Sequence, residues 1–413
     1  MAISPHKMRL LDVWLGKPLC ALLTLTRAAG RLVGRRDKLD RPVGKILFIK
    51  LIEQGATILA ADALKRAAEI VGRGNVYFLV FEENRAILDL LGLVDTDNVI
   101  SIRTGSPFTL VRDSLAALRR IRRLKIDCAI DMEFFARGSA VITYLTRARV
   151  RVGHDRFTSE GPYRGNLMTH RVEYNPYLHT AAAYRALVEA ISSDPADTPL
   201  LKQSMPATEP PPTFEPTKAE VEDVRKLLRN AAGREVRSPI VLLNPNASDI
   251  IPLRKWPTER FTELARRLLD EFDSLTVVIT GAPAEKEAGE QMAWQIGSDR
   301  AISLAGKTSL RELLALYSIS DALVTNDSGP GHFASITPID SVVLFGPETP
   351  RLYGPIGERS HVIWAGLACS PCVNAFNHRL SPCKNSVCMQ AITVDQVLES
   401  VREALGSRGA DAG

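Results

Sequence analysis

Residues 325–332 read TNDSGPGH and place a carboxylate, hydroxyls, two glycines and an imidazole within one short stretch. They follow an apolar run at residues 321–325 that is typical of a buried strand, and a helix is expected to begin near Gly329. A strand end, a glycine turn and a helix N-terminus present unpaired N–H groups and a positive dipole end, which suits a diphosphate. Asp327 would then bind a sugar or ribose hydroxyl or the neighbouring amides. The alternative is that Asp327 or Ser328 only caps the helix.

Two further predicted strands end in loops of similar character. The apolar run at residues 240–243 leads into the loop NPNAS, and two adjacent cations, Arg254 and Lys255, follow before the next helix. The run at residues 275–280 leads into Glu285 at the start of another helix. Open α/β sheets bind ligands at the carboxyl ends of their parallel strands, so we expect the three loops to share one edge of one sheet.

The order of these motifs resembles that of the ADP-heptose:lipopolysaccharide heptosyltransferases, which form glycosyltransferase family 9. The shared motifs are Asn-Pro-x-Ala at residues 244–247, Lys-Trp-Pro at 255–257 with a Glu in the next helix, Gly-x-x-x-Glu at 281–285, Asn-Asp-Ser-Gly-Pro-x-His at 326–332 and Phe-Gly-Pro-x-x-Pro at 345–350. The resemblance is strong over residues 240–355 and extends more weakly back to residue 46. It implies an α/β fold of the GT-B type, in which two Rossmann-like parallel-sheet domains face each other across a cleft.

The resemblance also implies a donor site in the second domain. Its predicted residues are Asn244, Ser248, Arg254, Lys255, Glu285, Asp327, Ser328, Gly329 and His332. Arg254 and Lys255 would neutralise the diphosphate, unless they form an exposed basic pair. Glu285 would hold ribose or sugar hydroxyls, unless it is a first-turn acid stabilised by the helix dipole. His332 would bind the phosphate or brace its loop, unless it is a core residue.

The predicted catalytic base departs from the family pattern. The family loop after the first strand usually reads Leu-Gly-Asp, and its Asp is the proposed general base, but the matching position here is Ala56, which cannot take a proton. Glu53 is the nearest carboxylate on that loop and is our predicted base, although it could be an ordinary loop residue. Asp131 and Glu133, at the end of the predicted strand 126–131, are further candidates. The departure weakens the inference that the donor is ADP-heptose.

These residues need two parallel sheets to position them. The chain has 413 residues, 45% of them hydrophobic, which exceeds one typical core and predicts two domains. Apolar runs alternate with helical periodicity from residue 44, as in βαβ units. In the first domain, strands are expected at 46–51, 76–80, 99–102, 126–131 and 150–153. We predict an arm at 1–40, a Rossmann-like acceptor domain at 41–205, a Pro-rich linker at 206–217, a nucleotide-sugar domain at 218–390, a helix at 391–405 that packs back on the first domain, and a tail at 406–413.

Composition and missing motifs exclude several classes of protein. The formal net charge is +5 and its charges are mostly interspersed, so no nucleic-acid partner is indicated. The first predicted strand is not followed by G-x-G-x-x-G, which disfavours a nicotinamide-type enzyme. A Walker-type G-x-x-x-x-G-K-[ST] is also missing, so ATP hydrolysis has no support.

The N-terminal arm is basic and amphipathic. Between residues 1 and 38 its cations are Lys7, Arg9, Lys17, Arg27, Arg31, Arg35, Arg36 and Lys38, against the acids Asp12 and Asp37. The apolar stretch is interrupted by Lys17 and Pro18 and is too short to span a bilayer. We predict that the arm lies in a membrane interface, where cations meet anionic headgroups. A helix packed on the first domain is the main alternative, and a cleaved signal peptide is less favoured.

Four of the six cysteines are clustered, with the spacing Cys369-x2-Cys372-x10-Cys383-x4-Cys388. Thiolates at this spacing can close a tetrahedral zinc site, and an intracellular protein makes disulfides less favoured. We predict a structural zinc site here, with reduced free thiols as the competing interpretation. Transfer itself is expected to need no cofactor.

Together these features predict an inverting, metal-independent glycosyltransferase. It would move a sugar, with heptose implied by the resemblance, from a nucleotide-sugar donor to a lipopolysaccharide or other cell-envelope glycolipid. The expected location is cytoplasmic and peripheral, on the inner face of the bacterial inner membrane. Two alternatives stay open: a nucleotide-sugar 2-epimerase of the same fold, and a non-catalytic nucleotide-sugar binder, for which Ala56 is the best argument.

Overall fold

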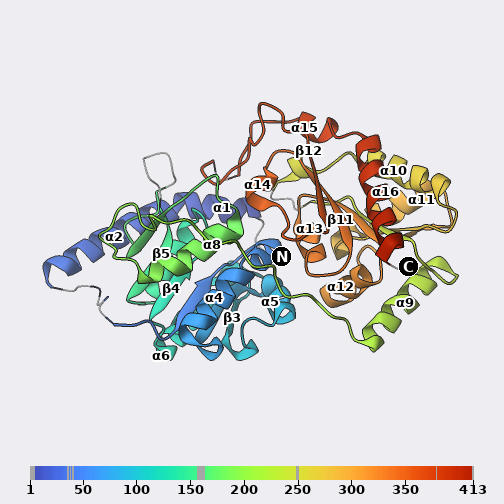
Figure 1. Ribbon diagram of the computed structural model, residues 1–413. Helices are drawn as coiled ribbons and strands as arrows, with labels where there is room; N and C mark the ends of the chain where they lie inside the picture. The colour runs from blue at the N-terminus through green and yellow to red at the C-terminus, as the bar shows by residue number, and fades with distance from the viewer. Residues whose placement is uncertain are drawn as a thin grey trace. The chain divides into compact units, whose positions relative to one another are not determined.

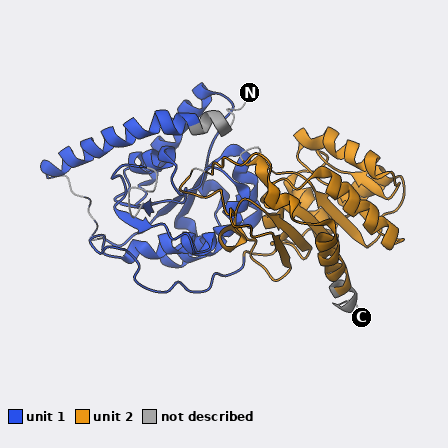
Figure 2. Cartoon of the chain, turned by 90° about the horizontal axis from the view of Figure 1, so that it is seen from above, with its two compact units in different colours: residues 1–210 blue, residues 211–413 orange. Residues whose placement is uncertain are grey.

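The computed structural model describes residues 5–34, 37, 39, 41–155, 163–247, 251–377 and 379–411. The chain divides into two compact units, Met1–Pro210 and Pro211–Gly413 (Figure 2). The division falls inside the proline-rich stretch at residues 206–217. Each unit is built around its own six-stranded parallel sheet with helices on its faces (Figure 1). This arrangement is the α/β class and the pair of parallel sheets that the sequence predicts.

The sheet of unit 1 has the strand order β3-β2-β1-β4-β5-β6. Its strands are β1 (Ile46–Ile49), β2 (Val76–Phe81), β3 (Val99–Ile102), β4 (Cys128–Asp131), β5 (Val150–Asp155) and β6 (His170–Glu173). All four residues of β1 are buried, as expected for a central strand of a parallel sheet. The strand order reverses between β1 and β4, and such a switch point opens a crevice at the carboxyl ends of the two strands.

Helices of unit 1 follow the strands in βα alternation. They are α3 (Gln54–Leu59), α4 (Ala61–Val71), α5 (Arg85–Leu91), α6 (Pro107–Leu124), α7 (Arg137–Leu145) and α8 (Thr180–Glu189). Ser106 caps the N-terminus of α6, because its hydroxyl accepts a hydrogen bond from Thr109 N, and Pro107 occupies the first position of the helix. One face of the sheet packs its aliphatic side chains, such as Leu47 and Leu79, into a continuous core.

Two helices precede β1 and form an arm along unit 1. They are α1 (Pro5–Trp14) and α2 (Gly16–Leu32), and α2 packs against α7. Among the described residues, no helix is both long and apolar enough to cross a membrane.

The sheet of unit 2 has the strand order β12-β11-β10-β7-β8-β9. Its strands are β7 (Ile240–Asn244), β8 (Thr276–Ile279), β9 (Ala301–Ser303), β10 (Ala322–Asn326), β11 (Asp340–Phe345) and β12 (Ser360–Trp364). The order reverses between β7 and β10, which pair in parallel with Thr325 opposite Asn244. The predicted loops after β7, β8 and β10 therefore begin at the same edge of the sheet.

The helices of unit 2 are α9 (Lys218–Ala232), α10 (Thr258–Glu271), α11 (Lys286–Ile296), α12 (Leu310–Ser318), α13 (Gly329–Ala334), α14 (Pro350–Tyr353), α15 (Val387–Gln390) and α16 (Val394–Asp411). Short 3-10 turns in the two units lie at Arg73–Asn75, Glu82–Asn84, Thr96–Asn98, Ala190–Ser192, Pro252–Arg254 and Pro283–Glu285. Trp256 is fully buried under α10, and its indole N–H donates to the Ile392 carbonyl at 3.0 Å.

The C-terminal helix α16 packs within unit 2, where it contacts α10, β10 and β11. The expected packing of residues 391–405 on the first domain stays a prediction. Val397 and Val401 are fully buried in the core of that unit. The helical spacing predicts an amphipathic helix correctly, yet it carries no information about which core receives the apolar face.

Candidate functional site

Polar side chains gather at the switch point of each sheet, and the two groups are described separately. In unit 2, Arg254 lies between two carboxylates. Its Nε is 3.2 Å from Asp327 Oδ2, its Nη1 donates to the Asp327 carbonyl at 3.2 Å, and its Nη2 pairs with Glu348. The Arg254 side chain is 12% exposed, against 4% for Asp327 and 1% for Glu348. The three residues form a buried ion-pair triad that ties the loop after β7 to those after β10 and β11.

Burial sets the electrostatics of this triad. It raises the pKa of Glu348 to about 7, although the Arg254 guanidinium opposes the shift. The pKa of Asp327 is also raised by burial, again against the effect of Arg254. Burial alone would lower the pKa of Arg254, but the two carboxylates outweigh it and the pKa is raised. The charge of Arg254 is thus compensated within the triad, which favours a positioning role for this residue over direct contact with a diphosphate.

Lys255 has a different environment from its neighbour. Its side chain is exposed, and it forms no ion pair with any residue in the described part of the chain. Of the two predicted cations, Lys255 is therefore the one whose charge is open to a ligand. Ser248, another predicted donor-site residue, lies outside the described residues.

Asparagines hold the loops at this edge. Asn326 is fully buried, its Oδ1 accepts from Trp256 N at 3.0 Å, and its Nδ2 donates to the Pro245 carbonyl at 3.0 Å. Asn244 is also buried and donates to Thr280 Oγ1 at 3.2 Å. The side-chain amides of both residues form hydrogen bonds with neighbouring segments. Asn244 therefore stabilises the loops of the site.

The segment after β10 forms the turn and helix that the sequence predicts. Ser328 Oγ donates to the Asn326 carbonyl at 3.1 Å, and α13 begins at Gly329. A Cβ at Gly331 would lie 3.2 Å from Val343, so a small residue lets α13 pack closely on β11. His332 is buried at 8% exposure within this short helix. This burial agrees both with the predicted role of bracing the loop and with the alternative of a core residue, so the role of His332 stays a prediction.

Glu285 lies at the same edge, in the turn that precedes α11. Its Oε2 accepts from Ala282 N at 2.6 Å, in the manner of a capping residue. A Cβ at Gly281 would lie 2.9 Å from both Glu285 Oε2 and Asn246 Nδ2, so the glycine lets these two groups approach. The structure brings Glu285 to the edge, and its contact with Ala282 N is a local capping role that the sequence does not predict.

In unit 1, three charged side chains meet at the switch point between β1 and β4. Lys50 Nζ is 2.9 Å from Glu133 Oε2 and 3.3 Å from Glu53 Oε2. The Lys50 side chain is only 2% exposed. Glu133 Oε1 accepts from Leu51 N at 2.9 Å, so the carboxylate also holds the loop that follows β1.

Glu53 has the strained backbone that is often found at functional positions. Its φ of 71° and ψ of 90° are unusual for a residue with a Cβ, and such conformations cost on the order of 1–3 kcal/mol. It directly precedes α3, and its side chain is 23% exposed, against 9% for Glu133. Among the three candidate bases, Glu53 is the most accessible to a substrate.

Asp131 is the least accessible candidate. It is fully buried, accepts from Ser139 Oγ at 3.0 Å and pairs with Arg164. Burial raises the pKa of Asp131 to about 6, although Arg164 opposes the shift. Its oxygens serve the fold of the loop, and Glu133 N also donates to Asp131 Oδ1 at 3.1 Å.

Sequence reasoning missed three residues of these groups: Lys50, Arg164 and Glu348. Lys50 carried a signal, because a cation that ends an apolar strand needs a buried counter-ion. Glu348 lay inside a recognised motif but at one of its variable positions. Arg164 carried no local signal, since only the fold brings it to Asp131.

The four clustered cysteines do not form a metal centre in this structure. Cys369 is exposed, Cys388 is buried, and Cys372 accepts from Ser381 Oγ at 3.1 Å. Burial raises the pKa of the Cys388 thiol. In the described parts of the chain, no three His, Cys, Asp or Glu side chains are placed to hold a metal ion. The predicted zinc site therefore gains no support from the arrangement of these thiols.

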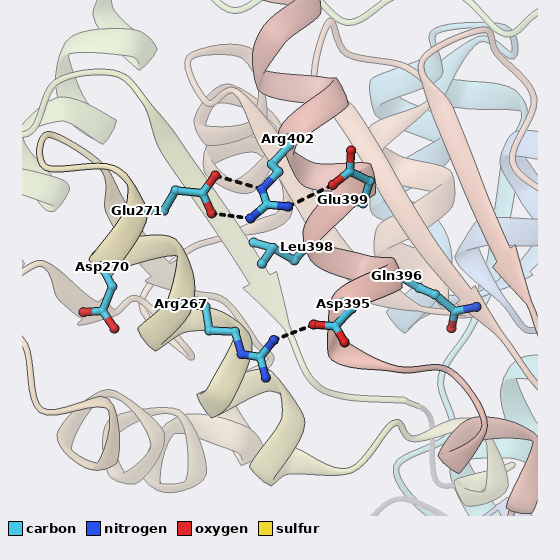
Figure 3. Close-up of a pocket in the computed structure, with 8 residues that line it drawn as sticks. All are labelled: Arg267, Asp270, Glu271, Asp395, Gln396, Leu398, Glu399 and Arg402. Carbon is cyan, nitrogen blue, oxygen red and sulfur yellow. Dashed lines mark hydrogen bonds and ion pairs between the residues drawn. The ribbon is translucent and has the colours of Figure 1, made fainter.

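A hollow of about 830 Å³ between α10 and α16 lies on unit 2 (Figure 3). Its charged lining is largely self-paired: Arg267 lies 2.6 Å from Asp395, and Arg402 lies 2.7 Å from Glu271 and 2.9 Å from Glu399. The first two pairs join the two helices and the third lies within α16, and such exposed pairs contribute little each. We interpret the hollow as part of the packing surface between α10 and α16 and not as a ligand site.

Comparison with known proteins places these features in one family. Residues 114–380, well over half of the chain, match the family described as glycosyltransferase family 9 (heptosyltransferase). Lipopolysaccharide heptosyltransferase 2 of Salmonella typhimurium is 29% identical over 157 residues, which cover 37% of this chain and 44% of the relative. Its Escherichia coli namesake is 32% identical over 128 residues, which cover 30% and 36%. The matched stretch thus spans less than half the length of these relatives.

The fold has solved counterparts. The structure of E. coli ADP-heptose lps heptosyltransferase II aligns with 88% of this chain and 99% of its own, with a TM-score of 0.68 and 20% identity. The glycosyltransferase family 9 structure from Veillonella parvula aligns with a TM-score of 0.66 and 18% identity, over 89% of this chain and 98% of its own. At these identities the likeness establishes the fold.

Proposed function

The chain belongs to glycosyltransferase family 9, and on that premise we propose that it is an inverting, metal-independent heptosyltransferase-type enzyme. Its donor would be a nucleotide sugar, with ADP-heptose the first candidate because a solved relative is named for that donor. Its acceptor would be a lipopolysaccharide-type glycolipid, since the curated relatives carry that name. The observation that carries the proposal is the family match over residues 114–380, which includes the triad at the switch point of unit 2.

Unit 2 would bind the nucleotide sugar. Lys255 supplies an exposed cation next to the triad, and the backbone N–H groups at the start of α13 add positive potential for a diphosphate. Arg254, Asp327 and Glu348 would keep the loops in place during binding. Glu285, at the same edge, would accept hydrogen bonds from donor hydroxyls.

Unit 1 would supply the base. Glu53 would take the proton of the acceptor hydroxyl while the hydroxyl oxygen forms a bond to the anomeric carbon. The bond between that carbon and the diphosphate oxygen breaks at the same time, and the nucleoside diphosphate leaves with the electron pair. Attack from the face opposite the leaving group inverts the anomeric centre. Lys50 would hold the Glu53 carboxylate in place, because it is itself fixed by Glu133.

Charge neutralisation of the leaving group is assigned to protein groups in this proposal. Lys255 and the amides of Ser328 and Gly329 would act where other transferases use a divalent ion. The acceptor glycolipid would lie in the cytoplasmic face of the inner membrane, and the enzyme would be peripheral there.

The test is a transfer assay with purified protein. Candidate nucleotide sugars are mixed with a heptose-free lipopolysaccharide core acceptor, and nucleoside diphosphate release is measured with and without EDTA. The proposal expects release that depends on both substrates and survives EDTA. Release that EDTA abolishes would refute metal independence, and no release with any donor would refute the transferase.

A binding screen supports the assay. Thermal unfolding is measured with ADP, GDP, UDP, CDP and their sugars, and a ligand at a hundred times its Kd should stabilise by about 2.7 kcal/mol. Stabilisation by one base, lost in Lys255→Ala, would identify the donor. Conversion of the donor without an acceptor would instead indicate an epimerase, and binding without turnover would indicate a non-catalytic binder.

A further inference from the structure

An apolar stripe lies on the outer face of the arm formed by α1 and α2. It consists of Leu11, Trp14, Leu15, Leu22, Leu25, Leu32 and Val33, which recur at spacings of three, four and seven residues. Trp14 is 75% exposed, Leu25 68% and Leu32 89%. The two helices run end to end along one side of unit 1 (Figure 2). The described part of the chain thus leaves a long row of large apolar side chains in water.

The inner face of the arm is fixed, so the stripe cannot turn inward. Cys20 is fully buried, and a Cβ at Gly16 would lie 2.7 Å from Arg137 Cβ. A Cβ at Gly165 would lie 2.8 Å from the Cys20 carbonyl oxygen. The segment around Gly165, between β5 and β6, therefore also packs closely against α2. The arm therefore has a defined inside and outside.

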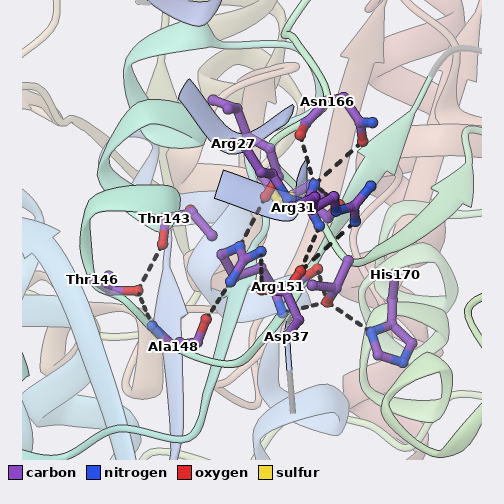
Figure 4. Close-up of polar contacts among 12 residues, drawn as sticks. Arg27, Arg31, Asp37, Thr143, Thr146, Ala148, Arg151, Asn166 and His170 are labelled. Atoms are coloured by element: carbon purple, nitrogen blue, oxygen red, sulfur yellow. Dashed lines mark hydrogen bonds and ion pairs between the residues drawn. The ribbon is translucent and has the colours of Figure 1, made fainter. Parts of the chain in front are cut away.

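A buried arginine locks this orientation (Figure 4). Arg27 donates to the Met168 carbonyl at 2.9 Å and pairs with Asp37 at 2.8 Å. Asp37 also pairs with Arg151 at 2.9 Å, and Arg31 lies 3.8 Å from it. Burial alone would raise the pKa of Asp37, but Arg151 and Arg27 outweigh it and the pKa is lowered. The network holds the C-terminal end of α2 against unit 1.

Among the described side chains of the arm, the well exposed charges are cations. Asp12 turns inward, where its Oδ1 accepts from Arg137 N and Gly138 N at 2.8 Å. Asp37 is used by the arginine network. Lys17 is exposed, and the Arg31 side chain is 51% exposed. Asp12 and Asp37, the acids in the described part of the arm, are thus compensated internally, and Lys17 and Arg31 are exposed cations on the helix that carries the stripe.

We propose that this stripe is the surface by which the protein binds an anionic phospholipid bilayer, with Trp14 and the leucines in the headgroup region and the cations on lipid phosphates. Cations next to exposed apolar side chains are the pattern that anionic interfaces recognise. A second copy of the chain fits less well, because it would bring like charges together and offers no exposed acid on its own stripe. The inference rests on the proposed function only for the identity of the acceptor lipid.

The test is co-sedimentation of the full-length protein with vesicles of phosphatidylglycerol and phosphatidylethanolamine, against vesicles of phosphatidylcholine alone. Binding is expected to the anionic vesicles, to weaken as salt rises, and to fall at least about tenfold in Trp14→Glu/Leu25→Glu. Both positions are exposed, so folding should be unaffected. Trp294→Glu is the matched control, because Trp294 is 81% exposed on unit 2, and it should bind as the wild type does.

Several outcomes would overturn the proposal. These are equal binding by the Trp14→Glu/Leu25→Glu variant and the wild type, equal binding to neutral and anionic vesicles, or a wild-type dimer that the variant converts to monomer. The assay contains no donor or acceptor, so its result is independent of transferase activity. A protein that binds vesicles but transfers no sugar would refute the proposed function alone, and an active protein that ignores vesicles would refute this inference alone.

Discussion

Lys50 and Glu133 form a buried ion pair at the switch point of unit 1, with Nζ and Oε2 2.9 Å apart. The same ammonium lies 3.3 Å from Glu53, the proposed base. Glu133 also accepts from the backbone N–H of Leu51. One carboxylate therefore fixes both the loop that carries the base and the cation that holds it.

Breaking this pair from one side should destabilise the protein. Lys50→Met leaves the Glu133 carboxylate buried without its cation, which should lower the free energy of unfolding by about 3–5 kcal/mol. Lys50→Met combined with Glu133→Gln should recover part of that loss. Urea unfolding of the two single variants and the double variant measures the coupling, and purely additive effects would contradict the pairing.

Replacement of the proposed base should separate catalysis from binding. Glu53→Gln should lower turnover by about 10²–10⁴-fold, because the amide cannot take the proton from the hydroxyl of the acceptor substrate. Nucleotide-induced thermal stabilisation should persist. Glu82→Gln, at an exposed position after the neighbouring strand β2, is the control and should keep wild-type turnover. Full activity in Glu53→Gln would show that another group is the general base.

The two adjacent cations of unit 2 should differ when replaced. Lys255→Ala should weaken nucleotide binding with a change in the free energy of unfolding below about 0.5 kcal/mol, because its side chain is exposed. Arg254→Met should destabilise by about 3–5 kcal/mol, since two buried carboxylates lose their counter-ion. Titration calorimetry and chemical unfolding give the two quantities. Equal loss of stability in both variants would contradict the division of roles.

Asp131 should give the stability a pH dependence. Its pKa in the folded protein is about 6, above the ordinary value of 3.8, so the folded state binds the extra proton between these limits. The stabilising contribution of the neutral carboxyl is present below pH 3.8 and is lost as pH rises through 6. The stability difference between wild type and Asp131→Asn should therefore fall by about 2.4 kcal/mol from pH 4 to pH 7.

Unfolding measured across that pH range checks this expectation. Asp97→Asn, at an exposed position in the same unit, is the control and should follow the wild type. A difference between wild type and Asp131→Asn that stays constant with pH would show that Asp131 remains ionised beside Arg164.

The sequence predicts the strands and the loops that follow them because apolar runs and glycine turns are local signals. β1, β4, β7 and β10 all appear close to their expected positions. The partners of the site residues are not local. Lys50 meets Glu133 only because β1 pairs with β4, and Arg254 meets Glu348 only because β7, β10 and β11 are neighbours. Strand β6 was not predicted, because His170 and Arg171 interrupt its apolar pattern.

The two sheets share one strand order. Read from the opposite edge, the order in unit 2 is β9-β8-β7-β10-β11-β12, which is the order of unit 1 advanced by six strands. In each unit the strand beyond the reversal leads to a buried carboxylate that an arginine neutralises: Asp131 with Arg164 and Asp327 with Arg254. Positions in one unit can therefore be matched to positions in the other strand by strand, with β1 equivalent to β7 and β4 equivalent to β10.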